Sequence, residues 1–97
     1  MPNPEELLVA ALSSCHMLTF LAIAARKRLV VNNYEDDAVG VMTKNEQGKL
    51  WVSSVVLHPR VAFAEPVNPS QLAGIHEQAH HECFIANSVR TEVRVET

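Results

Sequence analysis

The sequence has 97 residues, a length that fits one small domain. Hydrophobic residues make up 47% of the chain and charged residues 20%, the balance of an ordinary soluble globular protein. The formal net charge of −3 leaves no basic patch, which argues against nucleic acid as a partner. Residues 1–97 are therefore interpreted as a single domain without an internal linker.

The first predicted element is a long helix that begins at residues 3–6. Asn3 is a good N-cap, Pro4 suits the first helical position, and Glu6 completes a capping box with Asn3. Apolar residues recur at helical spacing: Leu8, Ala11, Leu12, Cys15, Leu18, Ala22 and Ala25. The basic residues 26–28 follow, and the helix dipole favours positive charge at that end.

Residues 7–25 of this helix carry no formal charge, so a membrane span has to be considered. Polar side chains at positions 13–16 and at Thr19 interrupt the run. Glu5 and Glu6 precede it, where a signal peptide would have cationic residues. We therefore expect a helix buried inside protein on nearly all sides, in a cytoplasmic protein that has no membrane partner.

A β-hairpin is predicted next. Residues 38–44 and 50–63 have strand character, and the turn between them places Gly48 where a positive φ is needed. Pro59 is expected as a bend or edge feature near the end of the second strand. Residues 31–37 are interpreted only as the break that follows the first helix.

The second predicted helix begins with the same chemistry as the first, since Asn68 caps it and Pro69 takes its first position, with Gln71 completing the box. Its apolar stripe consists of Leu72, Ile75, Ala79 and Cys83. Residues 91–96 then alternate as a closing strand, with Val93 and Val95 facing inward.

This order of elements, helix, strand, strand, helix, strand, predicts an α+β fold. Three strands and one short helix have too little area to cover a long helix that is apolar all round. Either a partner subunit covers it or a further part of the domain does. We expect a homodimer in which the long helices are central.

The segment His76-Glu77-x-x-His80 matches the zinc-binding motif of metalloproteases, in which two histidines project from one helix face. A protease of this kind needs a third ligand further along the chain, and no histidine follows His81. We interpret the match as chance and expect no functional metal. An opportunistic site formed by His76, His80 and Cys83 stays open, whereas His81 points to the opposite side.

Cys15 and Cys83 are the two cysteines of the chain. Both lie on the expected inward faces of their helices, so packing of the helices could bring the sulfurs together. They are then either inert core thiols or a redox pair. His16 is not a base for Cys15, because neighbours on a helix do not face each other. Glu5 lies about 15 Å along the helix from Cys15, so its role could only be indirect.

Two stretches resemble a known family. NPEELLVAALSSCHMLTFL, residues 3–21, is similar to the central-helix signature of the OsmC/Ohr family of osmotically inducible and organic hydroperoxide resistance proteins. HHECFIANSV, residues 80–89, is similar to its second-cysteine motif in the variant of a general OsmC-like subgroup. The resemblance covers residues 1–97. It implies an OsmC-like α+β fold in an intertwined homodimer with sites at the interface.

The resemblance also implies an activity, that of a thiol-dependent peroxidase in oxidative stress defence. Cys15 would attack an organic hydroperoxide and become a sulfenic acid. Cys83 would condense with it to a Cys15–Cys83 disulfide, which an external dithiol reduces, without metal or other cofactor. Glu5 matches the acidic residue that holds an arginine against the thiolate in the family.

The sequence departs from the family pattern in two ways. Family members are usually longer, and the N-terminal β-region that supplies the catalytic arginine has no counterpart here. Phe84 and Ala86 stand where better-characterised branches carry Pro and Ser, which leaves substrate preference open. None of the arginines maps to the catalytic one: Arg26, Arg28, Arg60, Arg90 and Arg94. The alternative is therefore a weakened or inactive OsmC-like module that dimerises or binds a ligand.

Overall fold

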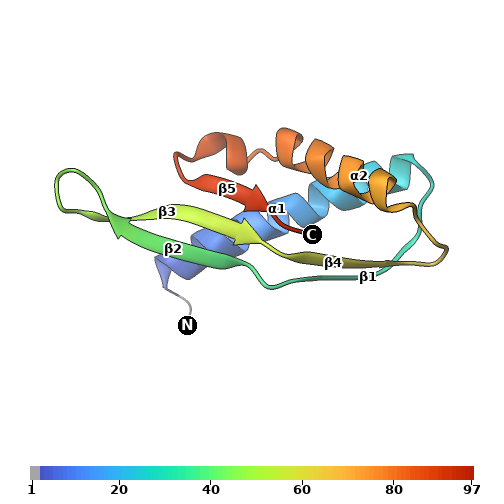
Figure 1. The fold of residues 1–97 in the computed structure, drawn as a ribbon, viewed down its shortest axis with the longest axis horizontal. Helices are drawn as coiled ribbons and strands as arrows, with labels where there is room; N and C mark the ends of the chain where they lie inside the picture. The colour runs from blue at the N-terminus through green and yellow to red at the C-terminus, as the bar shows by residue number, and fades with distance from the viewer. Residues whose placement is uncertain (1–2) are drawn as a thin grey trace.

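The computed structural model describes residues 3–97, which form two helices, a short 3₁₀ helix and two small sheets (Figure 1). In chain order the elements are α1 (Pro4–Arg26), β1 (Val31–Asp36), β2 (Val39–Lys44), β3 (Leu50–Leu57), β4 (Pro59–Phe63), α2 (Pro69–Glu82), η1 (Ala86–Ser88) and β5 (Glu92–Val95). The predicted α+β class is confirmed, with more strands than the sequence indicated.

Both predicted helix starts are confirmed. The Asn3 side chain accepts a hydrogen bond from the N–H of Glu6 at 2.8 Å, and Pro4 takes the first position of α1. At α2, Asn68 accepts from the N–H of Ser70 at 2.8 Å, again with a proline in the first turn. These local caps define where each helix begins before any tertiary contact is made.

The predicted hairpin is confirmed as β2 and β3, which pair antiparallel. In its turn the side chain of Asn45 accepts the N–H groups of Gln47 and Lys49, and Gly48 has a φ of 75°. The hairpin turn lies at one end of the molecule, and the α1–β1 and β4–α2 connections lie at the other (Figure 1).

The prediction of one strand over residues 50–63 is wrong, because the strand divides at His58. Its first part, β3, pairs with β2 on one side and in parallel with β5 on the other. Its second part, β4, pairs antiparallel with β1 in a separate two-stranded sheet. Residues 31–36, interpreted from sequence only as a helix break, therefore form a strand whose polar composition hid it.

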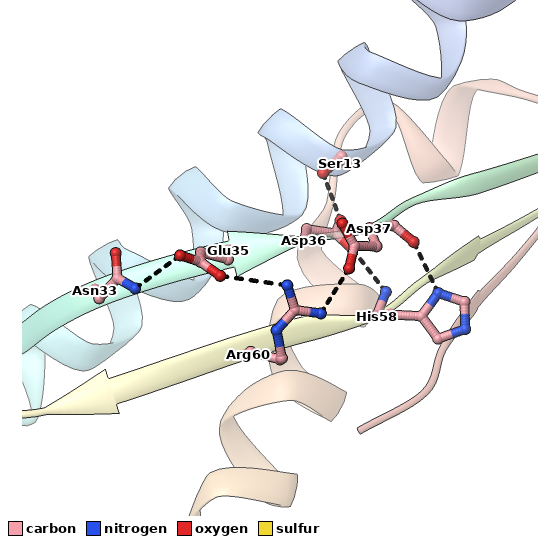
Figure 2. A network of polar contacts seen from close by, with 7 residues as sticks. All are labelled: Ser13, Asn33, Glu35, Asp36, Asp37, His58 and Arg60. Carbon is pink, nitrogen blue, oxygen red and sulfur yellow. Dashed lines mark hydrogen bonds and ion pairs between the residues drawn. The ribbon is translucent and has the colours of Figure 1, made fainter.

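Asp36 explains why the chain divides at His58. Its carboxylate accepts hydrogen bonds from the Ser13 hydroxyl on α1 and, at 2.6 Å, from the backbone N–H of His58. A backbone donor that a carboxylate takes is not available to a strand ladder. Figure 2 shows this contact joining α1 to the point where both strand pairs meet.

Exposed polar contacts continue from Asp36 along β1 and β4 (Figure 2). Arg60 donates to Asp37 at 2.8 Å and to Glu35 at 3.3 Å, and Asn33 donates to Glu35 at 3.2 Å. Because these charges are solvated, each pair contributes little to stability and mainly fixes the register of the two strands.

The core has two parts. Between the helices, Phe20, Ile23 and Ala24 of α1 pack against Ile75 and Ala79 of α2. The second part, formed by Leu12, Val55 and Leu57, lies between α1 and the three-stranded sheet. The predicted stripe of α2 is confirmed, since Ile75, Ala79 and Cys83 are all buried.

As expected from the small area of the other elements, this chain by itself does not bury α1 on all sides. Leu18 is 61% exposed, and Ala11, Ala22 and Ala25 of the predicted stripe are exposed too. The buried face is instead formed by Leu12, His16, Phe20, Ile23 and Ala24. A helix that is apolar all round carries no periodic signal to say which face turns inward. By length and composition alone α1 is also apolar enough to cross a membrane.

The molecule is elongated, with principal extents of 49 × 27 × 19 Å. Its radius of gyration is 14.5 Å, against about 12.5 Å for a compact domain of this length. The extra extent comes from α1 and the β2–β3 hairpin, which α2 does not cover over their whole length (Figure 1).

We predict that Phe20→Ala lowers the free energy of unfolding by about 3–5 kcal/mol, because the ring is fully buried against Tyr34, Phe63 and His76. Urea denaturation followed by circular dichroism measures this change. The control is Val30→Ala, which removes a side chain that is 63% exposed and should change stability by less than about 0.5 kcal/mol. Equal effects of the two substitutions would contradict the assignment of the core.

Candidate functional site

The candidate site is the pair of cysteines, which the packing of α1 against α2 brings together. Cys15 lies in the middle of α1, and Cys83 is the residue at which α2 ends. Both are free thiols. Cys15 is half-buried and Cys83 is only 2% exposed. The two thiols are close neighbours, since each of them shifts the pKa of the other.

The turn after α2 holds Cys83 in this position. The side-chain amide of Asn87 donates to the carbonyls of His81 and Cys83, both at 3.0 Å. The Ser88 hydroxyl donates to the carbonyl of Phe84 at 2.7 Å. These bonds satisfy carbonyl groups that the end of a helix leaves free. Sequence reasoning missed the role of Asn87, although an asparagine just beyond a helix end is a recognisable signal.

The same turn directs backbone N–H groups at both sulfurs. The N–H of Ala86 lies 3.5 Å from the sulfur of Cys83. The N–H groups of Ile85 and Phe84 lie near the sulfur of Cys15 and lower the pKa of its thiol. Successive amides that point at one centre form an anion-binding arrangement, here around a thiolate.

The two thiols differ in acidity. Burial raises the pKa of Cys15, but hydrogen bonds from the N–H of Ile85, the thiol of Cys83 and other donors outweigh it, so the net pKa lies below the ordinary value. The Thr19 hydroxyl also lowers the pKa of Cys15, and it donates to the carbonyl of the same residue at 2.8 Å. Burial and the neighbouring Cys15 raise the pKa of Cys83. Cys15 is therefore the better thiolate, and Cys83 stays protonated beside it.

Cys15 opens into a groove of about 630 Å³ that runs along the exposed face of α1. Phe84, 79% exposed, and Leu18 give the groove apolar walls. Arg26 lines its far end, about 16 Å along the helix from Cys15. No cation from residues 3–97 contributes to the lowered pKa of Cys15. A small apolar molecule fits the groove in contact with the sulfur.

Glu5 is not part of this groove. It lines a different cavity, of about 700 Å³, between the first half of α1 and strands β1 to β3. Tyr34 and Asp36 line the same cavity, whereas Cys15 does not. The structure thus brings together two of the three predicted site residues and leaves Glu5 apart, as its distance along the helix indicated.

The histidines of the zinc-like motif lie beside a partner that the sequence did not indicate. His76 Nδ1 is 3.0 Å from Nε2 of His16, and the two rings are nearly parallel with centroids 5.3 Å apart. Burial and the neighbouring His76 lower the pKa of His16 to about 4, and burial lowers the pKa of His76. Within residues 3–97 no group of three or more His, Cys, Asp or Glu side chains is placed to hold a metal ion.

Fold and site define an α+β protein with two neighbouring cysteines between its two helices. The family model described as OsmC-like protein matches residues 1–97, and the chain belongs to that family. In the search of solved structures, an OsmC-like protein of unknown function from Vibrio cholerae superposes with a TM-score of 0.89 at 56% identity over 96% of this chain. The chain spans 62% of the length of that protein.

More distant relatives share the fold. An organic hydroperoxide resistance protein from Elizabethkingia anophelis superposes with a TM-score of 0.79 at 22% identity, covering 97% of this chain and 64% of that one. Among curated proteins, the uncharacterised protein YmaD of Bacillus subtilis is 21% identical over 97% of this chain and 64% of its own length. The structural match supports the OsmC-like fold that the sequence resemblance implied.

We predict that the pKa of Cys15 rises when its thiol donor is removed. In Cys83→Ala the thiolate of Cys15 loses one hydrogen bond, whereas Cys83→Ser keeps a hydroxyl donor and should stay closer to the wild type. The rate of iodoacetamide modification between pH 5 and pH 10, read at the Cys15 peptide by mass spectrometry, measures the shift. Identical profiles for all three proteins would show that Cys83 does not stabilise the thiolate.

Proposed function

We propose that this protein reduces organic hydroperoxides with Cys15 as the attacking and Cys83 as the resolving cysteine. The observation that carries the proposal is the closeness of a thiol of lowered pKa to a thiol of raised pKa, at the wall of an apolar groove. Membership of the OsmC-like family, in which a fold relative is named an organic hydroperoxide resistance protein, supports it. The chain spans 62% and 64% of the length of the two solved structures named above. The proposal therefore concerns the chemistry of the cysteine pair.

In the first step the Cys15 thiolate attacks the terminal peroxide oxygen. A sulfur–oxygen bond forms, the O–O bond breaks, and the leaving alkoxide takes a proton to become an alcohol. Cys15 is left as a sulfenic acid. The amides of Phe84 and Ile85 hold the attacking thiolate in place, and the apolar groove accepts the organic part of the peroxide.

In the second step Cys83 attacks the sulfur of Cys15. The disulfide forms as the sulfenic oxygen leaves with the thiol proton as water. Because the two thiols already lie close enough to shift each other's pKa, we expect that little rearrangement is needed. An external dithiol then reduces the disulfide by exchange, and no metal or other cofactor takes part. A reducing compartment such as the cytoplasm suits this cycle.

We also propose that the active form is a homodimer. The exposed face of α1 carries Leu7 and Leu18, which are 55% and 61% exposed, and Phe84 lies beside it. An apolar surface of this kind commonly marks an interface. A second copy placed there would enclose the groove and exclude water from Cys15.

The alternative is a domain that binds a ligand or a second copy without catalysis. It is favoured by the absence, among residues 3–97, of a cation that lowers the pKa of Cys15. Under this alternative Cys15 titrates like a free thiol and the protein does not consume peroxide.

We predict that the wild type consumes cumene hydroperoxide in the presence of dithiothreitol, and that Cys15→Ser reduces the rate by about 100-fold or more because the nucleophile is lost. Consumption is followed by a colorimetric peroxide assay. Cys83→Ser should still react once and accumulate a sulfenic acid at Cys15 that dimedone traps. Equal rates for the wild type and Cys15→Ser would favour the non-catalytic alternative.

A further inference from the structure

The two helices that carry the cysteines are also joined by a buried pair of histidines. His16 follows Cys15 on α1, and His76 precedes Cys83 by seven residues, or two turns, on α2. Nε2 of His16 and Nδ1 of His76 are 3.0 Å apart, and the rings lie within 7° of parallel. Their side chains are almost completely enclosed, with 1% and 3% of each residue exposed.

Each imidazole makes one hydrogen bond and leaves its other nitrogen buried. Nδ1 of His16 and Nε2 of His76 have no hydrogen-bond partner among the residues that the structure describes. A neutral pair satisfies the contact, since one ring donates and the other accepts. A proton added to either ring places a charge and a further N–H where nothing accepts it, which is costly in a buried site.

The surroundings do not compensate for that charge. The groups near the pair are Asp36 at the end of β1, Glu77 and His80 on α2, Arg94 on β5, and Glu96 just after β5. Asp36 favours protonation of both rings, but its carboxylate already accepts from Ser13 and from the N–H of His58. Burial outweighs Asp36 at both rings, and His80 further disfavours a proton on His16.

We propose that the His16–His76 pair is a proton-sensitive contact that holds α2 against α1 and thereby keeps Cys83 at Cys15. When the pair takes up a proton, α2 separates from α1 locally and withdraws Cys83, while the rest of the fold stays in place. The site would thus couple the acidity of the surroundings to the distance between the two sulfurs.

The direction of the effect follows from proton linkage. His16 has a pKa of about 4 in the closed arrangement, against about 6.5 for a solvated imidazole, so the open form binds more protons. Acid therefore favours opening. With these two values the ratio of open to closed forms rises about 60-fold between pH 7 and pH 4.5.

For the proposed peroxidase, on which this consequence rests, opening would affect the second step. A Cys15 sulfenic acid that Cys83 cannot reach persists. A second hydroperoxide then oxidises it to a sulfinic acid and leaves as an alcohol. At neutral pH the Cys15–Cys83 disulfide would form and be reduced again. In acid, a second hydroperoxide would instead inactivate the protein by oxidising Cys15 to the sulfinic acid.

The test measures the exposure of Cys83 and needs no peroxide. Cys83 is 2% exposed, so an aromatic disulfide such as 4,4′-dithiodipyridine, which reacts with thiols even in acid, modifies it mainly from the open form. The reference protein and every variant carry Cys15→Ser, because the Cys15 thiol would otherwise react first and Cys83 would displace the reagent as an intramolecular disulfide. The comparison protein is His16→Gln/His76→Asn, whose amides place a donor and an acceptor near the same nitrogens but do not titrate. Dividing the two rates at each pH removes the common effect of thiol ionisation.

We predict that this ratio, wild type over the double variant, rises about 60-fold between pH 7 and pH 4.5. The matched control is His81→Gln, which changes an exposed histidine on the same helix and should behave as the wild type. A ratio that changes by less than about threefold would overturn the proposal. So would a His81→Gln protein that loses the pH dependence.

Amide hydrogen exchange in the wild type provides a second measurement should the double variant fail to fold. Protection of α2, corrected for intrinsic exchange rates, should fall about 60-fold between pH 7 and pH 4.5 while β3 keeps its protection. A parallel loss in α2 and β3 would indicate global unfolding and overturn the proposal. Neither measurement depends on peroxide turnover. Failure of the proposed histidine contact can therefore be distinguished from failure of the proposed peroxidase function.

Discussion

The packing of α1 against α2 is the contact on which the rest of the site depends. Phe20 and Ile23 on one helix meet Ile75 and Ala79 on the other in a fully buried cluster. This burial holds the end of α2 beside the middle of α1, and the turn at Cys83 follows from it. The closeness of the two thiols thus depends on apolar packing about one to two helical turns away.

Backbone geometry supplies the electrostatics of the site. Within residues 3–97, the groups that lower the pKa of Cys15 are the amides of Phe84 and Ile85 together with two neutral side-chain groups. Amide dipoles that a turn holds rigidly need no reorganisation when a charge develops. Asn87 makes that turn rigid by bonding two carbonyls at once. This turn lowers the pKa of Cys15 without a cation. A cation from a longer protein or from a partner would lower that pKa further.

The open face of α1 relates the shape of the chain to its proposed assembly. Leu12 and Phe20 turn into the core, whereas Leu18 on the other side lies in solvent beside Cys15. The elongated outline leaves this face accessible along its length. Catalysis by a thiolate benefits from the exclusion of water, which one open groove does not provide. The same surface therefore connects the proposed dimer to the proposed chemistry.

Local signals in the sequence were sufficient for the elements that are stabilised locally. Asn3 and Asn68 with the prolines after them define both helix starts, and Gly48 with Asn45 defines the hairpin turn. The stripe of α2 also indicated that Cys83 faces inward. Each of these depends on residues within a few positions of one another, so composition and spacing carry the information.

Other features arise only when distant segments meet. By itself the sequence determined the two helices, the hairpin, the closing strand and the two cysteines as candidates. Only the tertiary structure decided that Asp36 divides the strand at His58, that His16 pairs with His76, and which face of α1 is buried. The two hydrogen bonds join residues at least 22 positions apart, so no local pattern encodes them. The buried face of α1 could not be predicted because the helix has no polar face to mark the opposite side.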